Sequence, residues 1–343
     1  MTVRPLRHLG VAKVARAGEW WEFKLVPALA AAYATALMLD VPIVSLGRTI
    51  LVLLFALVSG AVFVSLLNDA TDRADDAAAG KPNRLAGRSN AFIATALTAS
   101  ILPGIVIVWW WRADAALLAA YAGAWIAFAA YSLPPFRLKQ RGAWGLLADA
   151  AGAHLFPALM AVLSIFVVTD RAPDPIWLGA IGVWALSFGA RGILWHQMAD
   201  AENDRSTGVR TFVVQTSPRT ALRLARYLAF PAESAALAVL LWRLGEPAPL
   251  MGLVVYAVLV IGRVVYFQQF PVIVESRPRY LILLHEYYGV LLPVSLLLTS
   301  ASHDGRDWLA LVAHCALFPG AILATTSDSL RITYRCFRGY RLK

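Results

Sequence analysis

Residues 49–76 read TILVLLFALVSGAVFVSLLNDATDRADD, an apolar run that ends in the acidic stretch Asn68-Asp69-Ala70-Thr71-Asp72-Arg73-Ala74-Asp75-Asp76. A helix needs about 20 mostly apolar residues to cross a bilayer, and this run is long enough. Four carboxylates within eight residues are costly beside a membrane unless a cation holds them together. The stretch therefore predicts a membrane-spanning helix with a cation site at its end.

A second acidic stretch, Asp200-Ala201-Glu202-Asn203-Asp204, follows another apolar run in the same way. On a helix Asp200 and Asp204 share one face, and a helix continued past Asn68 would also place Asp69, Asp72 and Asp76 on one face. Oxygen ligands with no cysteine and few histidines favour Mg²⁺, which completes its shell with substrate phosphates. Two such clusters predict a diphosphate between them, although carboxylates that only cap helices are the alternative. The candidate metal-binding and catalytic residues are Asp69, Asp72, Asp76, Asp200 and Asp204.

The composition is that of a membrane protein. Of 343 residues, 59% are hydrophobic and 15% are charged, whereas soluble domains carry nearer ~25% charged residues. Cys315 and Cys336 give neither a disulfide framework nor a metal-ligand spacing. We predict an all-α membrane protein, a bundle of nine to ten transmembrane helices. The expected spans are residues 25–46, 49–68, 91–111, 114–133, 144–168, 176–197, 220–242, 248–268 and 280–300, with a weaker tenth at 307–326.

The basic residues predict the orientation of these spans. The net charge of +10 would be compatible with nucleic-acid binding, but the bases gather on alternate loops. With the N-terminus in the cytoplasm, the opposite side keeps only Arg48, Arg112, Arg171, Arg243 and Arg306. This asymmetry explains the basic pI without nucleic acid and places both acidic clusters on the cytoplasmic side. We expect an integral multi-pass protein of a bacterial inner (plasma) membrane.

The chain divides into three expected segments. Residues 1–24 form a basic, interfacial N-terminus on the cytoplasmic side, with Trp20 and Trp21 as an interfacial anchor and no evident secretory signal peptide. Residues 25–300 form the helical bundle. Residues 301–343 hold the possible tenth helix and a basic cytoplasmic tail.

Four motifs in order resemble those of the UbiA-type intramembrane prenyltransferases. They are Asn68-Asp69-x-x-Asp72-x-x-x-Asp76, Lys81-Pro82-Asn83-Arg84, Tyr131-Ser132-Leu133-Pro134-Pro135-Phe136-Arg137-Leu138-Lys139 and Asp200-x-x-x-Asp204. The resemblance covers roughly residues 20–300. One departure is Leu85-Ala86-Gly87-Arg88, where relatives usually continue into another proline.

The resemblance implies a helical bundle around a central, lipid-accessible cavity. It also implies Mg²⁺-dependent transfer of a prenyl group from a polyprenyl diphosphate to an acceptor within the membrane, either an aromatic or quinone-precursor ring or another lipid precursor. By resemblance, the diphosphate-binding residues are Asn68, Lys81, Arg84, Arg137, Lys139 and Arg210.

Two other functions stay open at this point. A UbiA-type terpene cyclase would act on the prenyl diphosphate without an acceptor. A cation transporter would use the carboxylates as an ion path, but such carboxylates are expected near the bilayer midplane rather than at the ends of spans.

A further set of polar residues is a possible acceptor pocket, although ordinary packing between helices is the alternative for each. The set comprises His196, Gln197, Glu286 and Tyr287.

Two buried charges also need partners, because a charge inside a span is costly. We expect Arg191 to pair with Asp149, and Arg263 with Glu286.

Overall fold

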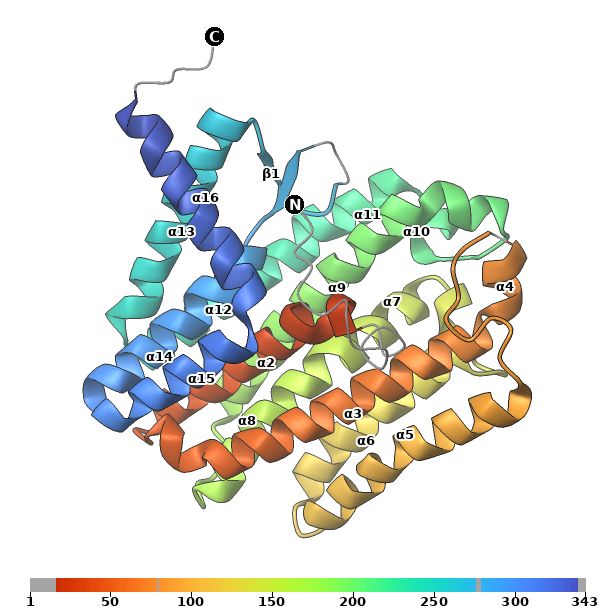
Figure 1. The fold of residues 1–343 in the computed structure, drawn as a ribbon, viewed down its shortest axis with the longest axis horizontal. Coiled ribbons are helices and arrows are strands. Elements are labelled where there is room, and N and C mark those ends of the chain that lie inside the picture. Colours follow the sequence, from red (N-terminus) through yellow and green to blue (C-terminus); the bar gives the residue numbers. More distant parts are fainter. Residues whose placement is uncertain (1–16, 79, 276–278, 339–343) are drawn as a thin grey trace.

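The computed structural model describes residues 17–78, 80–275 and 279–338 (Figure 1). The basic residues expected at positions 1–16, Arg277 and the last five residues of the tail therefore lie outside the described part of the chain. The helices are α2 (Ala17–Met38), α3 (Gly47–Thr71), α4 (Arg73–Ala78), α5 (Asn90–Trp110), α6 (Ala115–Ser132), α7 (Ala143–Ala150), α8 (Phe156–Val168), α9 (Pro175–Ser206), α10 (Phe212–Gln215), α11 (Pro218–Leu224), α12 (Phe230–Leu244), α13 (Pro247–Phe267), α14 (Leu292–His303), α15 (Trp308–Leu317) and α16 (Pro319–Phe337).

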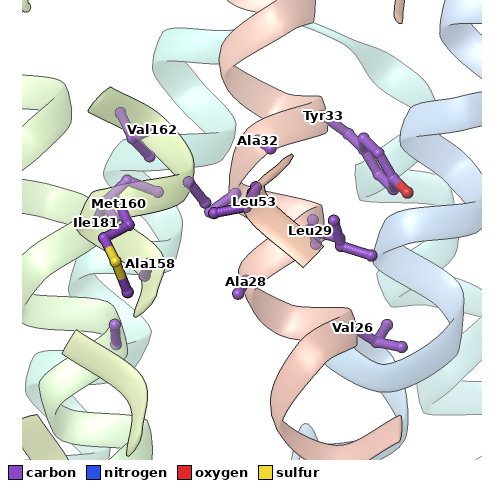
Figure 2. Close-up of a cluster of buried hydrophobic side chains, with 14 of the residues drawn as sticks. Val26, Ala28, Leu29, Ala32, Tyr33, Leu53, Ala158, Met160, Val162 and Ile181 are labelled. Atoms are coloured by element: carbon purple, nitrogen blue, oxygen red, sulfur yellow. The ribbon is translucent and has the colours of Figure 1, made fainter. Parts of the chain in front are cut away.

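Helix α2 lies in the middle of the bundle, where α8 and α14 pack on it. Figure 2 shows Leu29 and Tyr33 on one side of α2, while Met160 and Val162 of α8 lie across from the other side. Small residues allow this close approach, since Ala28 and its neighbours on α2 are almost fully buried. The core of the bundle is therefore built on an alanine-rich first helix.

Three π-helical turns interrupt the helices of the described residues. Residues Ala151–Leu155 join α7 to α8, Ala225–Ala229 join α11 to α12, and Tyr287–Leu291 lead into α14. Turns of this kind frequently mark functional sites. Beside the helices, the part of the chain that the structure describes holds one small parallel pair of strands, β1 (Phe270–Val272) and β2 (Tyr280–Ile282). The predicted all-α class is thus confirmed apart from this pair, and the ninth expected span begins with a strand instead of a helix.

In the described residues, seven helices are long and apolar enough to cross a membrane, or eight if the bent pair α15–α16 is one span. The predicted number of nine to ten is not confirmed. Helix α2 carries Glu22 and Lys24 in its first turns, and α14 has only 12 residues after its π-helical turn. The chain is nevertheless a multi-pass membrane protein by the number of its long apolar helices.

The expected tenth span is wrong as a single straight helix. The chain breaks at Phe318, and the helical segments on either side of it meet at 88°. The Glu22 carboxylate accepts hydrogen bonds from the backbone N–H groups of Gly320 (2.7 Å) and Ala321 (2.8 Å), so it caps α16. The Trp21 indole donates to the carbonyl of Leu317 (2.9 Å). Trp21 and Glu22, at the predicted interfacial anchor, therefore also stabilise the bend between α15 and α16.

Two buried arginines tie helices together. Arg191 of α9 forms a two-pronged ion pair with Glu233 of α12, with both N···O distances 2.6 Å, so the expected pairing with Asp149 is wrong. Glu233 is the nearer carboxylate because α9 packs along α12. The expected pair of Arg263 with Glu286 is confirmed.

Candidate active site

Both acidic clusters lie at one end of the bundle, which we call the acidic end: residues 68–76 at the end of α3 and residues 200–204 near the end of α9. In Figure 1 the short helix α4, which carries the end of the first cluster, and α10, which follows the second, lie together at the right of the view. The Lys81 ammonium group, in the loop after α4, lies 3.9 Å from the Asp200 carboxylate. The backbone N–H of Lys81 donates to the carbonyl of Asp76 (2.8 Å), so this residue contacts both clusters.

The first cluster is not on one continuous helix, which corrects the prediction. Helix α3 ends at Thr71, Asp72 is its C-terminal cap, and α4 begins at Arg73. The turn is closed by backbone hydrogen bonds from Asp72 N–H to Asn68 (2.9 Å) and from Asp76 N–H to Asp72 (2.8 Å). The break separates Asp69, which is buried on α3, from Asp76 on α4.

The loop at residues 80–88 folds back on this cluster. The Asn83 amide donates to the Asp76 carboxylate (2.7 Å) and to the backbone carbonyl of Asp69 (2.8 Å). The Arg84 guanidinium lies 3.7 Å from the Asp69 carboxylate. Asn83 thus ties the two parts of the broken helix together, and Arg84 places positive charge beside the buried carboxylate.

The loop between α6 and α7 supplies the basic partners of Asp72. Lys139 donates a hydrogen bond to the Asp72 carboxylate, and Arg137 lies 3.6 Å from it and 2.7 Å from Asp75. Arg137 has a left-handed backbone with φ of 38°, a conformation that costs free energy in a residue with a side chain. Burial lowers the pKa of Lys139, and the charge of Asp72 opposes this shift.

The second cluster lies on the last turns of α9, as predicted, since the helix continues to Ser206. Asp204 is buried and accepts a hydrogen bond from the Thr211 hydroxyl (3.4 Å). The Gln197 side chain accepts one from the backbone N–H of Val213 (3.3 Å). Gln197 therefore fixes the chain that follows α9, while Asp200 stays exposed toward Lys81.

Tyr131 is a residue of the site that sequence reasoning quoted but did not assign. The Tyr131 side chain at the end of α6 is near three carboxylates, Asp149 first and then Asp72 and Asp204, one from each cluster. Asn83 and Asp75 were also given no role. All three lie inside or beside the quoted motifs, so the motifs themselves were the signal.

The described residues contain no group of three carboxylate, imidazole or thiol side chains close enough to hold a metal ion by themselves. The donors at the acidic end are oxygens from two facing clusters, with Lys81, Arg137 and Lys139 between and beside them. Such a set fits Mg²⁺, which usually binds one or two carboxylates and several phosphate oxygens rather than a complete protein cage.

Other predicted site residues lie apart from these contacts. Arg210 is exposed, and no ion pair to it occurs among the described residues. Glu286 is held by Arg263 and Thr325, and the Tyr287 hydroxyl donates to the carbonyl of Pro249 (2.9 Å). His196 is exposed one turn before Asp200, beside Trp195. Asn68, in contrast, lies within the first cluster, where its side chain accepts a hydrogen bond from the Ser132 hydroxyl.

The comparison with protein families settles the family. Residues 24–272 match the model of the UbiA prenyltransferase family. The chain belongs to this family. The match includes every residue of both acidic clusters and of the two basic loops that face them. No curated protein matches the chain significantly.

Solved structures show the same fold. A UbiA homologue from Archaeoglobus fulgidus bound to GPP and Mg²⁺ is similar with a TM-score of 0.54 and 13% identity, covering 88% of this chain and 99% of that one. The homologue bound to DMAPP and Mg²⁺ gives 0.51 and 15% identity, covering 93% and 99%. A further structure of the homologue gives 0.52 and 14%, covering 88% and 98%.

Proposed function

We propose that this UbiA-family protein is a Mg²⁺-dependent prenyltransferase that moves a prenyl group from a prenyl diphosphate to an acceptor inside the membrane. The observation that carries the proposal is the pair of acidic clusters that Lys81 contacts together, Asp76 through its backbone N–H and Asp200 through its ammonium group. The relatives of known structure bind GPP or DMAPP together with Mg²⁺, which supports the same ligands here.

The side chains of the acidic end suit a diphosphate that leaves as an anion. Asp69, Asp72, Asp76, Asp200 and Asp204 would hold Mg²⁺ directly or through water, and the metal would supply Lewis-acid stabilisation of the leaving charge. Lys81, Arg84, Arg137 and Lys139 would place positive charge where the negative charge develops. These bases now contact carboxylates, and a bound metal would free them for the phosphate oxygens.

The proposed reaction is a substitution at the first carbon of the prenyl group. The bond from this carbon to oxygen breaks and the diphosphate departs with the electron pair. The acceptor then forms the new bond to the carbon and loses a proton. The apolar walls of the bundle exclude water, which would otherwise capture the allylic cation.

An apolar cavity between α2, α9, α12 and α14 suits the prenyl chain. Its lining combines Ala30 and Ala34 of α2 with Trp177, Ile181 and several leucines. Aromatic faces such as that of Trp184, which also lines it, stabilise nearby positive charge. We propose further that the acidic end faces the cytoplasm of a bacterial cell, because the basic loops gather there.

The purified full-length chain in lipid nanodiscs tests the proposal. Labelled geranyl and farnesyl diphosphates are supplied with Mg²⁺ and a lipid extract, and products are read by mass spectrometry. Prenylated acceptors that disappear with EDTA are expected. Cyclised hydrocarbon made without any extract would instead support the terpene cyclase, and absence of Mg²⁺-dependent diphosphate binding would reject both.

A further inference from the structure

Helix α16 has an inner face that is fixed to the bundle. The Arg263 guanidinium of α13 lies 3.2 Å from the Asp328 carboxylate of α16. Gly262 lets the two helices approach closely, because a Cβ atom there would lie 2.7 Å from the Ile332 side chain. Contacts with α13 therefore determine how α16 is turned about its own axis.

The opposite face of α16 carries large apolar side chains that the other described residues leave exposed, and we call them the apolar stripe. They are between 54% and 88% exposed and comprise Leu323, Leu330, Tyr334 and Phe337. At about 100° per residue these positions fall within a sector of about 60° on the helix surface. A continuous apolar surface of this kind marks contact with a membrane or with another protein.

A row of basic side chains adjoins the apolar stripe. It consists of Arg331, Arg335 and Arg338, which occupy the next sector of the helix and are exposed. Arg331 lies 3.8 Å from Asp328, but no carboxylate in the described part of the chain pairs with Arg335 or Arg338. The guanidinium groups of these two residues lie over aromatic rings instead. Two positive charges at the end of α16 are thus available to an anion.

Helix α16 runs across the bundle and not along it. The helical segment that precedes it meets it at 88°, and in Figure 1 α16 extends to the upper left, across the direction of α15. Its first turn is capped by Glu22, near the start of α2. Helix α2 starts on the side of the bundle where α3 ends, since a short connection at residues 39–46 joins their other ends. The side that carries α16 is therefore also the side of the acidic end.

We propose that α16 lies in the plane of the membrane surface on the side of the acidic end, and that Arg335 and Arg338 bind the phosphate group of an anionic phospholipid there. The apolar stripe then contacts the acyl chains. An apolar face flanked by basic side chains is typical of helices that lie in the interface. Guanidinium groups bind phosphate oxygens through charge-assisted hydrogen bonds, and anionic lipids attract basic segments beside a membrane.

The charges of α16 argue against the alternative in which it completes a span with α15. Asp328, Arg331 and Arg335 all lie within the helix, and charged side chains are costly in the hydrocarbon region. In the plane of the surface, the same charges stay beside headgroups and water. The inference concerns the lipid around the protein and does not depend on the proposed prenyl transfer.

The depth of the apolar stripe tests the orientation of α16. In the full-length chain with Cys315→Ser and Cys336→Ser, spin labels are attached to Leu323→Cys, Leu330→Cys or Phe337→Cys. Collision rates with oxygen and with a water-soluble nickel chelate, measured in nanodiscs, give the depth of each label. An in-plane helix places all three labels at one depth, just below the headgroups.

Two results of this measurement would overturn the proposal. If α16 spans the membrane, the labels at positions 323 and 337 differ in depth by up to about 21 Å, the length of this segment along a helix axis. If α16 lies in water, the nickel chelate reaches all three labels freely.

Local lipid composition tests the phosphate site. A fluorophore at Leu330→Cys, in the same cysteine-free background, is quenched by brominated phosphatidylglycerol or by brominated phosphatidylcholine at equal mole fractions. We expect stronger quenching by phosphatidylglycerol. Arg335→Gln combined with Arg338→Gln should reduce this preference by about fivefold or more, since each basic side chain near an anionic surface contributes to the attraction. Arg335→Lys combined with Arg338→Lys should keep most of it.

Two controls accompany these variants. Arg306→Gln removes a base that already pairs with Asp304 at 2.7 Å, and it should leave the preference unchanged. A fluorophore at Val258→Cys, on the exposed surface of α13, should be quenched equally by both lipids, and the same result in the double Gln variant shows that the bundle is intact.

The proposal is wrong if both lipids quench the label at position 330 equally in the chain that keeps both arginines, or if the double Gln variant keeps the full preference. A label that neither lipid quenches, in a chain whose Val258 label is quenched, would show that a second copy or another protein covers the stripe. That outcome also overturns the assignment to lipid.

Discussion

Ion pairs between a basic side chain and a carboxylate occur both in the bundle core and at the acidic end, but the two kinds differ in their exposure to solvent. In the core, Arg191 and Glu233 are both almost fully buried and meet in a two-pronged pair. At the acidic end, Lys81 and Asp200 are 38% and 60% exposed and lie 3.9 Å apart. The first pair is closed to solvent, while the second is open enough to take up the metal or phosphate that we propose for this site.

This difference teaches how to separate structural from functional charge in a membrane protein. A buried pair that loses one member leaves an uncompensated charge in a low-dielectric interior. A part-exposed pair is weak by itself, so its loss affects binding more than folding. Each experiment below breaks or sharpens one side of this contrast.

Replacement of Glu233 by Ala should have the largest effect on stability. The change strands Arg191 and removes the acceptor of the Tyr288 hydroxyl, so the expected loss is about 3–5 kcal/mol. The melting temperature of the detergent-solubilised chain measures it. Glu202→Ala, at an exposed position of α9, is the matched control and should change the free energy of unfolding by no more than about 0.5 kcal/mol. Equal melting temperatures for both variants would show that the core pair is not structural.

Replacement of Asp72 by Asn should act on turnover instead. Removal of one preorganised electrostatic group lowers kcat by about 100- to 1000-fold in comparable sites, and we expect that range here. The melting temperature should change little, because Asp72 is part-exposed and Asn keeps the shape. Asp170→Asn, an exposed carboxylate outside both clusters, should be fully active. Turnover at the wild-type rate would contradict the role of the first cluster.

A third variant tests what stabilises the bend between α15 and α16. Glu22→Gln removes the charge that caps α16 but keeps an acceptor oxygen, so the expected local cost is about 0.3–1 kcal/mol. Faster hydrogen exchange of the amides of Gly320 and Ala321 measures it. Glu246→Gln, at a helix start without a side-chain cap, should leave exchange in α13 unchanged. Unaltered exchange in α16 would show that Glu22 does not hold the bend.

The smallest effect concerns Lys139 and pH. Burial lowers its pKa in the folded chain, whereas the unfolded chain keeps the proton up to about pH 10.4. At a pH between the pKa of Lys139 in the folded chain and its pKa in the unfolded chain, the unfolded state binds more protons. The free energy of unfolding therefore rises with pH in this interval. Lys139→Met should flatten that rise. Unfolding curves measured across this interval test it, and an unchanged slope would refute the buried-lysine interpretation.

The sequence predicted the acidic end better than the rest of the site. Asp200 and Asp204 share a helix as their spacing requires, because α9 simply continues past its apolar stretch. The break of the helix at Asp72 was missed, because the loop that stabilises it is not visible in the local pattern. Asn83 of this loop donates hydrogen bonds to Asp69 and Asp76, one on each side of the break. The pairing of Arg191 with Glu233 was also missed, because Asp149 and Glu233 are equally far from Arg191 along the chain and only the packing of α9 on α12 decides between them.

By itself, the sequence determined the class of the protein, its long apolar helices and the motifs of its family, because hydropathy and local spacing are properties of the chain. The tertiary structure decided which distant groups meet. It placed Lys81 against Asp200, turned α16 away from α15 over Glu22, and brought Lys24 and His154 to one small cavity. Such contacts depend on helix packing, which brings together residues that no local pattern relates.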